Sequence, residues 1–158
     1  MHKVGLAAAR VLALLSAGFG LASSTTALAA PPTGVTIEEA YVVLGTQMEP
    51  AVGFLVIANG GGFDTTLVSV SNRAGGAGLL ISASGKVMVN GALIPIHSEL
   101  YMTPGGVRLE FGRIAENVSV GDSVVLVARF LDGSEIELNA LVLGPEQQVP
   151  DHHDFQHS

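Results

Sequence analysis

The pattern of hydrophobic and polar residues after residue 34 is typical of an all-β domain. Short runs alternate apolar with polar positions or are rich in β-branched residues, and glycine, proline, asparagine and aspartate separate them. The pattern predicts strands at 35–43, 52–58, 66–71, 79–82, 87–89, 107–111, 123–131 and 135–143. No window beyond the first thirty residues keeps a helical period. A series of short strands with regular turns predicts two antiparallel sheets packed as a sandwich, or a barrel.

The strongest turn signal is Asp132-Gly133, which separates two long alternating runs. An Asp-Gly pair favours a type I′ turn, because both central residues of that turn need a positive φ. The runs 123–131 and 135–143 are therefore predicted to pair as an antiparallel hairpin. Two prolines in the stretch 144–150 prevent a further strand. Residues 145–158 are predicted to form a flexible tail.

The first thirty residues have the pattern of an export signal. His2, Lys3 and Arg10 give a positive start, an apolar run follows, and Ala27-Leu28-Ala29 supplies small residues for cleavage. We predict a signal peptide at 1–29, a domain at 30–144 and the tail at 145–158. The alternative is an uncleaved membrane anchor, since residues 11–30 carry no charge and are about long enough to span a bilayer. Cleavage predicts a periplasmic or secreted protein that is not integral to the membrane once processed.

Composition and charge narrow the range of partners. The chain has 158 residues and no cysteine, so neither a disulfide nor a lipid attached through cysteine is expected. All fourteen acidic residues but only five of the seven basic ones lie after residue 30, which gives that part a net charge of −9. Such a surface repels phosphate backbones and anionic lipid, so nucleic acid is not an expected partner. Cations and basic proteins suit it better.

Several segments carry a resemblance to a known family. They are the opening strand 37–41, the segments 53–61, 67–71 and 102–107, and the closing hairpin 121–143. In order and spacing they resemble the PCu(A)C family of periplasmic copper(I) chaperones. The resemblance implies a cupredoxin-like (Ig-like) two-sheet antiparallel sandwich. It also implies a protein that binds or delivers copper in the periplasm, with a copper ion or a copper-accepting protein as its partner.

The resemblance also locates the expected copper ligands, and most of them are replaced. The family binds Cu(I) through a His and a Met in mid-chain and a His-x-Met pair after a Pro-Gly-Gly turn, and Cu(I) prefers such soft donors. The first pair falls near Leu80 and on Met88 or Asn90, and the second on Arg108 and Glu110. Because apolar neighbours alternate inward, the charged pair is predicted to share the outer face and to interact. The core site is thus predicted to be degenerate, with Met88 as its remaining ligand.

Three histidines near the end of the chain are the other candidate metal ligands. His152, His153 and His157 stand beside Asp151 and Asp154. Neutral imidazole binds Cu(II), Zn(II) and Ni(II), and a short histidine-rich tract can wrap around such an ion. The alternative is a solvated terminus with a chance cluster of histidines. The predicted metal ligands are therefore His152, His153, His157 and Met88, and copper is the predicted ion.

The remaining candidates point away from catalysis. His97 follows Pro95 and is expected to be a surface or loop residue. Met48, Met88 and Met102 either fill gaps in the core or join His97 in a rearranged Cu(I) site. The chain lacks a convincing nucleophile with a base, so an enzyme is not predicted. Two hypotheses remain: an exported copper-chaperone-like carrier, or a non-metal interaction module that keeps the same fold.

Overall fold

The computed structural model describes residues 29–46, 49–74, 76–112, 114 and 117–150. Over these residues the chain forms strands and turns, and no helix in them is long and apolar enough to cross a membrane. The strands are β1 (Val35–Val43), β2 (Ala51–Asn59), β3 (Thr65–Asn72), β4 (Ala77–Ile81), β5 (Ala92–Ile94), β6 (Ser98–Tyr101), β7 (Arg108–Phe111), β8 (Ser123–Phe130) and β9 (Glu135–Leu143). The predicted all-β class is confirmed.

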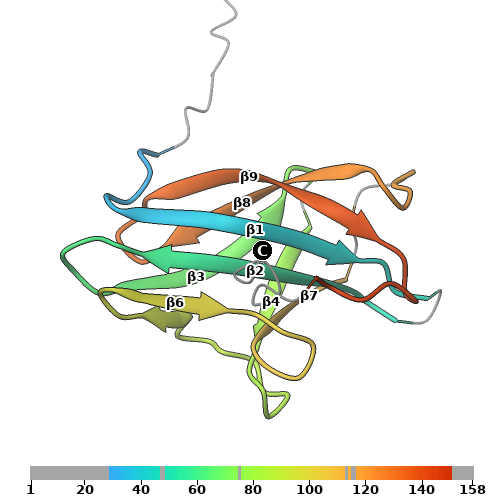
Figure 1. Ribbon diagram of the computed structural model, residues 1–158, viewed down its shortest axis with the longest axis horizontal. Helices are drawn as coiled ribbons and strands as arrows, with labels where there is room; N and C mark the ends of the chain where they lie inside the picture. Colours follow the sequence, from blue (N-terminus) through green and yellow to red (C-terminus); the bar gives the residue numbers. More distant parts are fainter. Residues whose placement is uncertain (1–28, 47–48, 75, 113, 115–116, 151–158) are drawn as a thin grey trace, which may run out of the picture.

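The strands join edge to edge into a sheet that closes on itself. Their order is β1-β9-β8-β3-β4-β7-β2, and β2 pairs in turn with β1. β1 lies between β9 and β2, as Figure 1 shows, and it runs antiparallel to β2 but parallel to the end of β9. β5 and β6 lie outside this ring, on β3 and β2 respectively. The sequence predicted a two-sheet sandwich or a barrel, and the pairing joins the described strands into one sheet that the β1–β2 pairs close.

Several strands differ from those that the sequence predicted. β1 has the predicted bounds, but residues 87–89 form only an isolated bridge between Ile81 and Val87. A tight turn precedes this bridge, with Lys86 O accepting from Ser82 N at 2.9 Å. Gly91, with a φ of 78°, then turns the chain away before a strand can extend. The short strands β5 and β6 that follow were not predicted.

The β8–β9 hairpin is confirmed, but its turn is not type I′. Its loop has three residues rather than two, because Phe130 N donates to Ser134 O and Gly133 N donates to Phe130 O, both at 2.9 Å. Gly133 has a φ of 84°, whereas Asp132 is not among the described residues with positive φ. The Asp132 carboxylate accepts from Ser134 N at 2.9 Å. This bond favours an ordinary turn followed by a left-handed glycine.

The closed sheet surrounds an apolar core, to which β7 contributes two side chains. Leu109 and Phe111 are fully buried there. The Phe111 ring fits because glycines flank it: a Cβ at Gly53 or Gly78 would lie only 2.8 or 2.7 Å from its ring carbons. The inward positions of β7 are therefore committed to packing, and only its outward positions are open to another role.

Candidate functional site

β7 presents two charged side chains on the face opposite the core. Its burial alternates: Leu109 and Phe111 are buried, while Arg108 and Glu110 are half-buried on the outer face. This alternation follows from the two-residue period of a strand and confirms the predicted orientation of the charged pair. Val107, which precedes β7, is partly buried and packs against the core.

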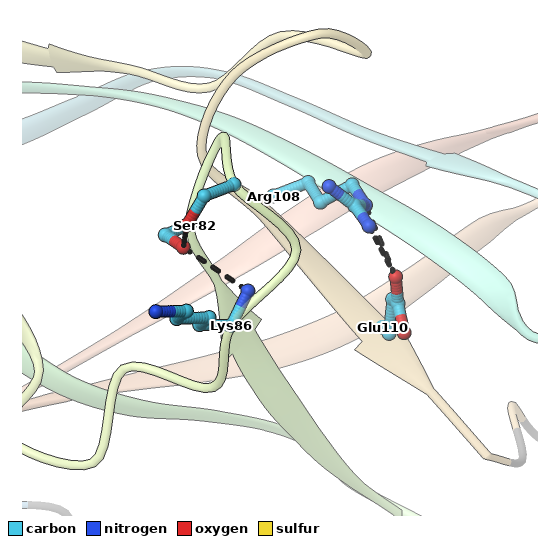
Figure 2. Close-up of polar contacts among 5 residues, drawn as sticks. Ser82, Lys86, Arg108 and Glu110 are labelled. Atoms are coloured by element: carbon cyan, nitrogen blue, oxygen red, sulfur yellow. Dashed lines mark hydrogen bonds and ion pairs between the residues drawn. The ribbon is translucent and has the colours of Figure 1, made fainter.

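Arg108 and Glu110 form a close ion pair. Glu110 Oε1 accepts from Arg108 Nε at 3.0 Å and from Nη2 at 2.8 Å, as Figure 2 shows. The two side chains are 23% and 29% exposed, so the pair is only partly open to solvent. A guanidinium has no lone pair to offer a metal, and Glu110 Oε1 is engaged with it. The two positions therefore hold an ion pair and offer no soft donor atom.

Leu80 is the residue near which the resemblance places the first histidine. It lies on β4, pairs with Leu109 of β7 and is 4% exposed. Its side chain belongs to the core, whereas the next residue, Ile81, lies opposite Arg108 in the register of the two strands. A leucine has no donor atom. This position contributes hydrocarbon packing and no ligand.

Met88 is the remaining candidate from the family pattern. Its backbone N donates to Leu80 O at 2.8 Å, which holds it beside the end of β4. Its side chain is partly buried against the core. Met102 is 2% exposed within the core, in agreement with a packing role. Met48 lies outside the described residues.

The histidines fall into two groups. His97 is exposed in the turn between β5 and β6, with a φ of 53°, so its prediction as a surface loop residue is confirmed. His152, His153 and His157 lie outside the described residues. In the described part of the chain, no three residues among His, Cys, Asp and Glu gather in a way that could hold a metal ion.

A pocket opens beside the ion pair. It has a volume of about 650 Å³, and Arg108 is the one charged residue among the described residues that line it. The other lining residues are Val43, Val52, Phe54, Pro104, Pro145, Gln147, Gln148 and Val149. Mostly apolar walls with a few polar groups are typical of ligand pockets, and the volume is in the usual range.

Apart from Arg108, the pocket residues were not identified from the sequence. One wall comes from residues 145–149, which were predicted to belong to a flexible tail. Gly144 N donates to Gln147 Oε1 at 2.7 Å and Gln147 N donates to Gly144 O at 3.0 Å, so this segment turns back onto the domain. Val149 packs against the core. The one sequence signal for this contact was the apolar Val149, which stands between Gln148 and Pro150.

Tyr41 adds a polar group to the same outer face. It pairs with Phe54 across β1 and β2, next to the pocket. Burial raises the pKa of the Tyr41 hydroxyl, and the negative charge and hydrogen bond of Glu39 raise it further, followed by Tyr101. The hydroxyl therefore stays protonated at neutral pH and acts as a hydrogen-bond donor to Glu39.

The fold is that of a PCuAC domain. The copper-bound PCuAC domain from PmoF2 has a TM-score of 0.62 at 20% identity, and the likeness covers 71% of this chain and 94% of that domain. Apo-DR1885 from Deinococcus radiodurans has a TM-score of 0.58 at 16% identity, over 94% of this chain and 99% of that one. The CuI form of DR1885 gives 0.58 at 19% identity, over 80% and 87%. Likeness at these identities shows a shared fold.

The family is shown by the sequence match. Residues 35–142 match the LpqE-like family, whose description is "Putative lipoprotein LpqE-like". This match covers β1 through nearly all of β9, and the chain belongs to this family. No curated protein gives a significant match.

Proposed function

We propose that this protein is an exported copper-handling protein of the chaperone type, which binds or delivers copper in the periplasm. The observation that carries the proposal is the fold shared with PCuAC domains, including the copper-bound domain from PmoF2 and CuI-DR1885. In this proposal residues 1–29 are a cleaved signal peptide. Residues 30–144 form the cupredoxin-like sandwich, and residues 145–158 carry metal ligands.

Copper is held mainly outside the family's core position. Leu80 offers no donor atom, and Arg108 and Glu110 are bonded to each other, so three of the expected ligand positions are lost. The donors that remain are imidazole nitrogens in the tail and the thioether of Met88. Imidazole accepts Cu(II), whereas a thioether favours Cu(I). The role is carriage of the ion rather than catalysis.

Copper titration of the chain without residues 1–29 tests this function. Replacing His152, His153 and His157 with alanine is expected to weaken Cu(II) binding by roughly tenfold or more, about 1.4 kcal/mol. His97→Ala is the matched control, because it removes an exposed histidine from a turn of the domain. Met88→Leu is expected to weaken Cu(I) binding alone. Equal affinities in the triple variant and the control would contradict a tail site.

A second function is favoured by the ion pair itself. A charged pair and a buried leucine at the ligand positions suit a module that has kept the sandwich and contacts a partner protein without metal. The pocket beside Arg108 supplies a surface for such contact. Copper binding no stronger than that of an unrelated acidic protein would favour this interaction module over the carrier.

A further inference from the structure

The pocket beside β7 combines apolar walls with one cationic edge. Val43, Val52 and Phe54 come from β1 and β2, and Pro104 comes from the turn before β7. Arg108 directs Nε and Nη2 to Glu110. A guanidinium has five N–H donors, and no described residue other than Glu110 accepts a side-chain bond from this one. The pocket therefore suits a ligand that has an apolar group next to a negatively charged group.

The chain itself passes along this pocket shortly before its end. Residues 145–149 form one wall, and the bonds between Gly144 and Gln147 hold them there. The described chain ends at Pro150, directly after the lining residue Val149. Residues 151–158 follow Pro150 directly in the sequence.

These last residues have the matching chemistry. Phe155 is the one aromatic residue among them, and Asp154 precedes it. A phenylalanine side chain buries roughly 150–250 Å² and fits easily in a pocket of this size. A carboxylate pairs well with a guanidinium. Phe155 is six positions after Val149, so the chain between them spans at most about 20 Å, which is enough to loop back into the adjoining pocket.

We propose that the pocket is a docking site for the chain's own C-terminal segment, with Phe155 in the apolar cavity and Asp154 against Arg108. Tethering makes this contact intramolecular, at an effective concentration of roughly millimolar, so even a weak contact is populated. The proposal depends on the pocket and on the residues that follow it, and it holds whether or not the histidines bind copper.

NMR of the metal-free chain from residue 30 to 158, with a chelator present, tests the docking. The probes are the methyl resonances of Val43, Val52 and Val149, which line the pocket. Phe155→Ala and Asp154→Asn are each expected to shift these resonances in the same direction, with the larger shift for Phe155→Ala. His157→Ala, which alters the tail without removing the aromatic or acidic group, is the control and is expected to leave them in place.

Three outcomes decide the question. Shifts that do not depend on protein concentration support docking within one chain. Shifts that appear only as concentration rises would mean that the pocket captures the tail of a second copy, and this would overturn the proposal. Unchanged pocket resonances in Phe155→Ala would overturn it as well. Arg108→Gln provides a second measurement. If Asp154 docks against Arg108, Asp154→Asn should shift the pocket resonances less in the Arg108→Gln background than in the wild-type chain.

Discussion

Arg108 and Glu110 decide what the outer face of β7 can bind. Their ion pair stands where the PCu(A)C resemblance places a histidine and a methionine, and both positions point away from the core. The alternation of apolar residues in the sequence was enough to predict this orientation. The identity of the replacing side chains then predicted their pairing, because an arginine and a carboxylate two residues apart lie on one face.

Restoring the soft ligands provides a direct test of this position. Arg108→His with Glu110→Met, in a chain truncated after Pro150, is expected to raise Cu(I) affinity by roughly tenfold or more, with Met88 as a nearby donor. Competition with a chromogenic Cu(I) chelator measures the change. Replacing both residues with leucine is the control, since it removes the ion pair without adding donors. Equal affinity in the two double variants would show that this face is not a copper position.

Asp132 gives a residue-scale prediction of pH dependence. Hydrogen bonds from the Ser134 side chain and backbone lower its pKa below the ordinary value of 3.8. The folded state therefore binds fewer protons than the unfolded state between the two pKa values. The resulting stabilisation is present above about pH 3.8 and is lost as pH falls through the lower pKa of the folded state.

Two hydrogen bonds from Ser134 lower the pKa of Asp132, and Ser134→Ala removes the one with the larger effect, which comes from the hydroxyl. The pKa of Asp132 is expected to rise toward its ordinary value, because only the backbone bond remains. Carboxyl carbon NMR over an acidic titration measures it, with Ser84→Ala as a control at an exposed serine elsewhere. An unchanged Asp132 pKa in Ser134→Ala would rule out the hydroxyl as its cause.

At the scale of elements, long alternating runs were predicted well and short irregular ones were not. β1, β8 and β9 agree with the sequence pattern to within a residue, because each has eight or nine residues facing alternately in and out. β5 and β6 have three and four residues, and a proline and a left-handed His97 separate them. Such segments are too short for periodicity to identify. The pocket was missed because its walls come from three segments that are far apart in the sequence.

Phe111 packs closely between glycines of β2 and β4. Gly78→Ala is expected to destabilise the fold by about 1–3 kcal/mol, since its new methyl group would lie 2.7 Å from a ring carbon in a core with no room to yield. Chemical denaturation measures the loss. Gly112→Ala is the matched control, with open space around its position and an ordinary φ. A similar loss in both variants would argue against crowding at Phe111.

In the molecule as a whole, seven of the described strands form the closed ring, and β5 and β6 are attached outside it. β1 closes the ring by pairing on both edges, with β2 and with β9. A register shift between Ile37 and Glu39 lets the strand bend as it does so. The described pairings attach β5 only to β3, and β6 only to β2. Opening either appended strand leaves every pairing of the ring intact.

Hydrogen exchange is therefore expected to show two levels of protection. The amides of β5 and β6 should exchange at least about tenfold faster than those of β8 and β9, a difference of ~1.4 kcal/mol in opening free energy. Mass spectrometry of the native protein, resolved to these segments, measures the rates. β8 and β9 share seven paired positions and bury Leu126 and Val142, so their amides should open only with global unfolding. If all four strands exchanged at one rate, β5 and β6 would belong to the same cooperative unit as the ring.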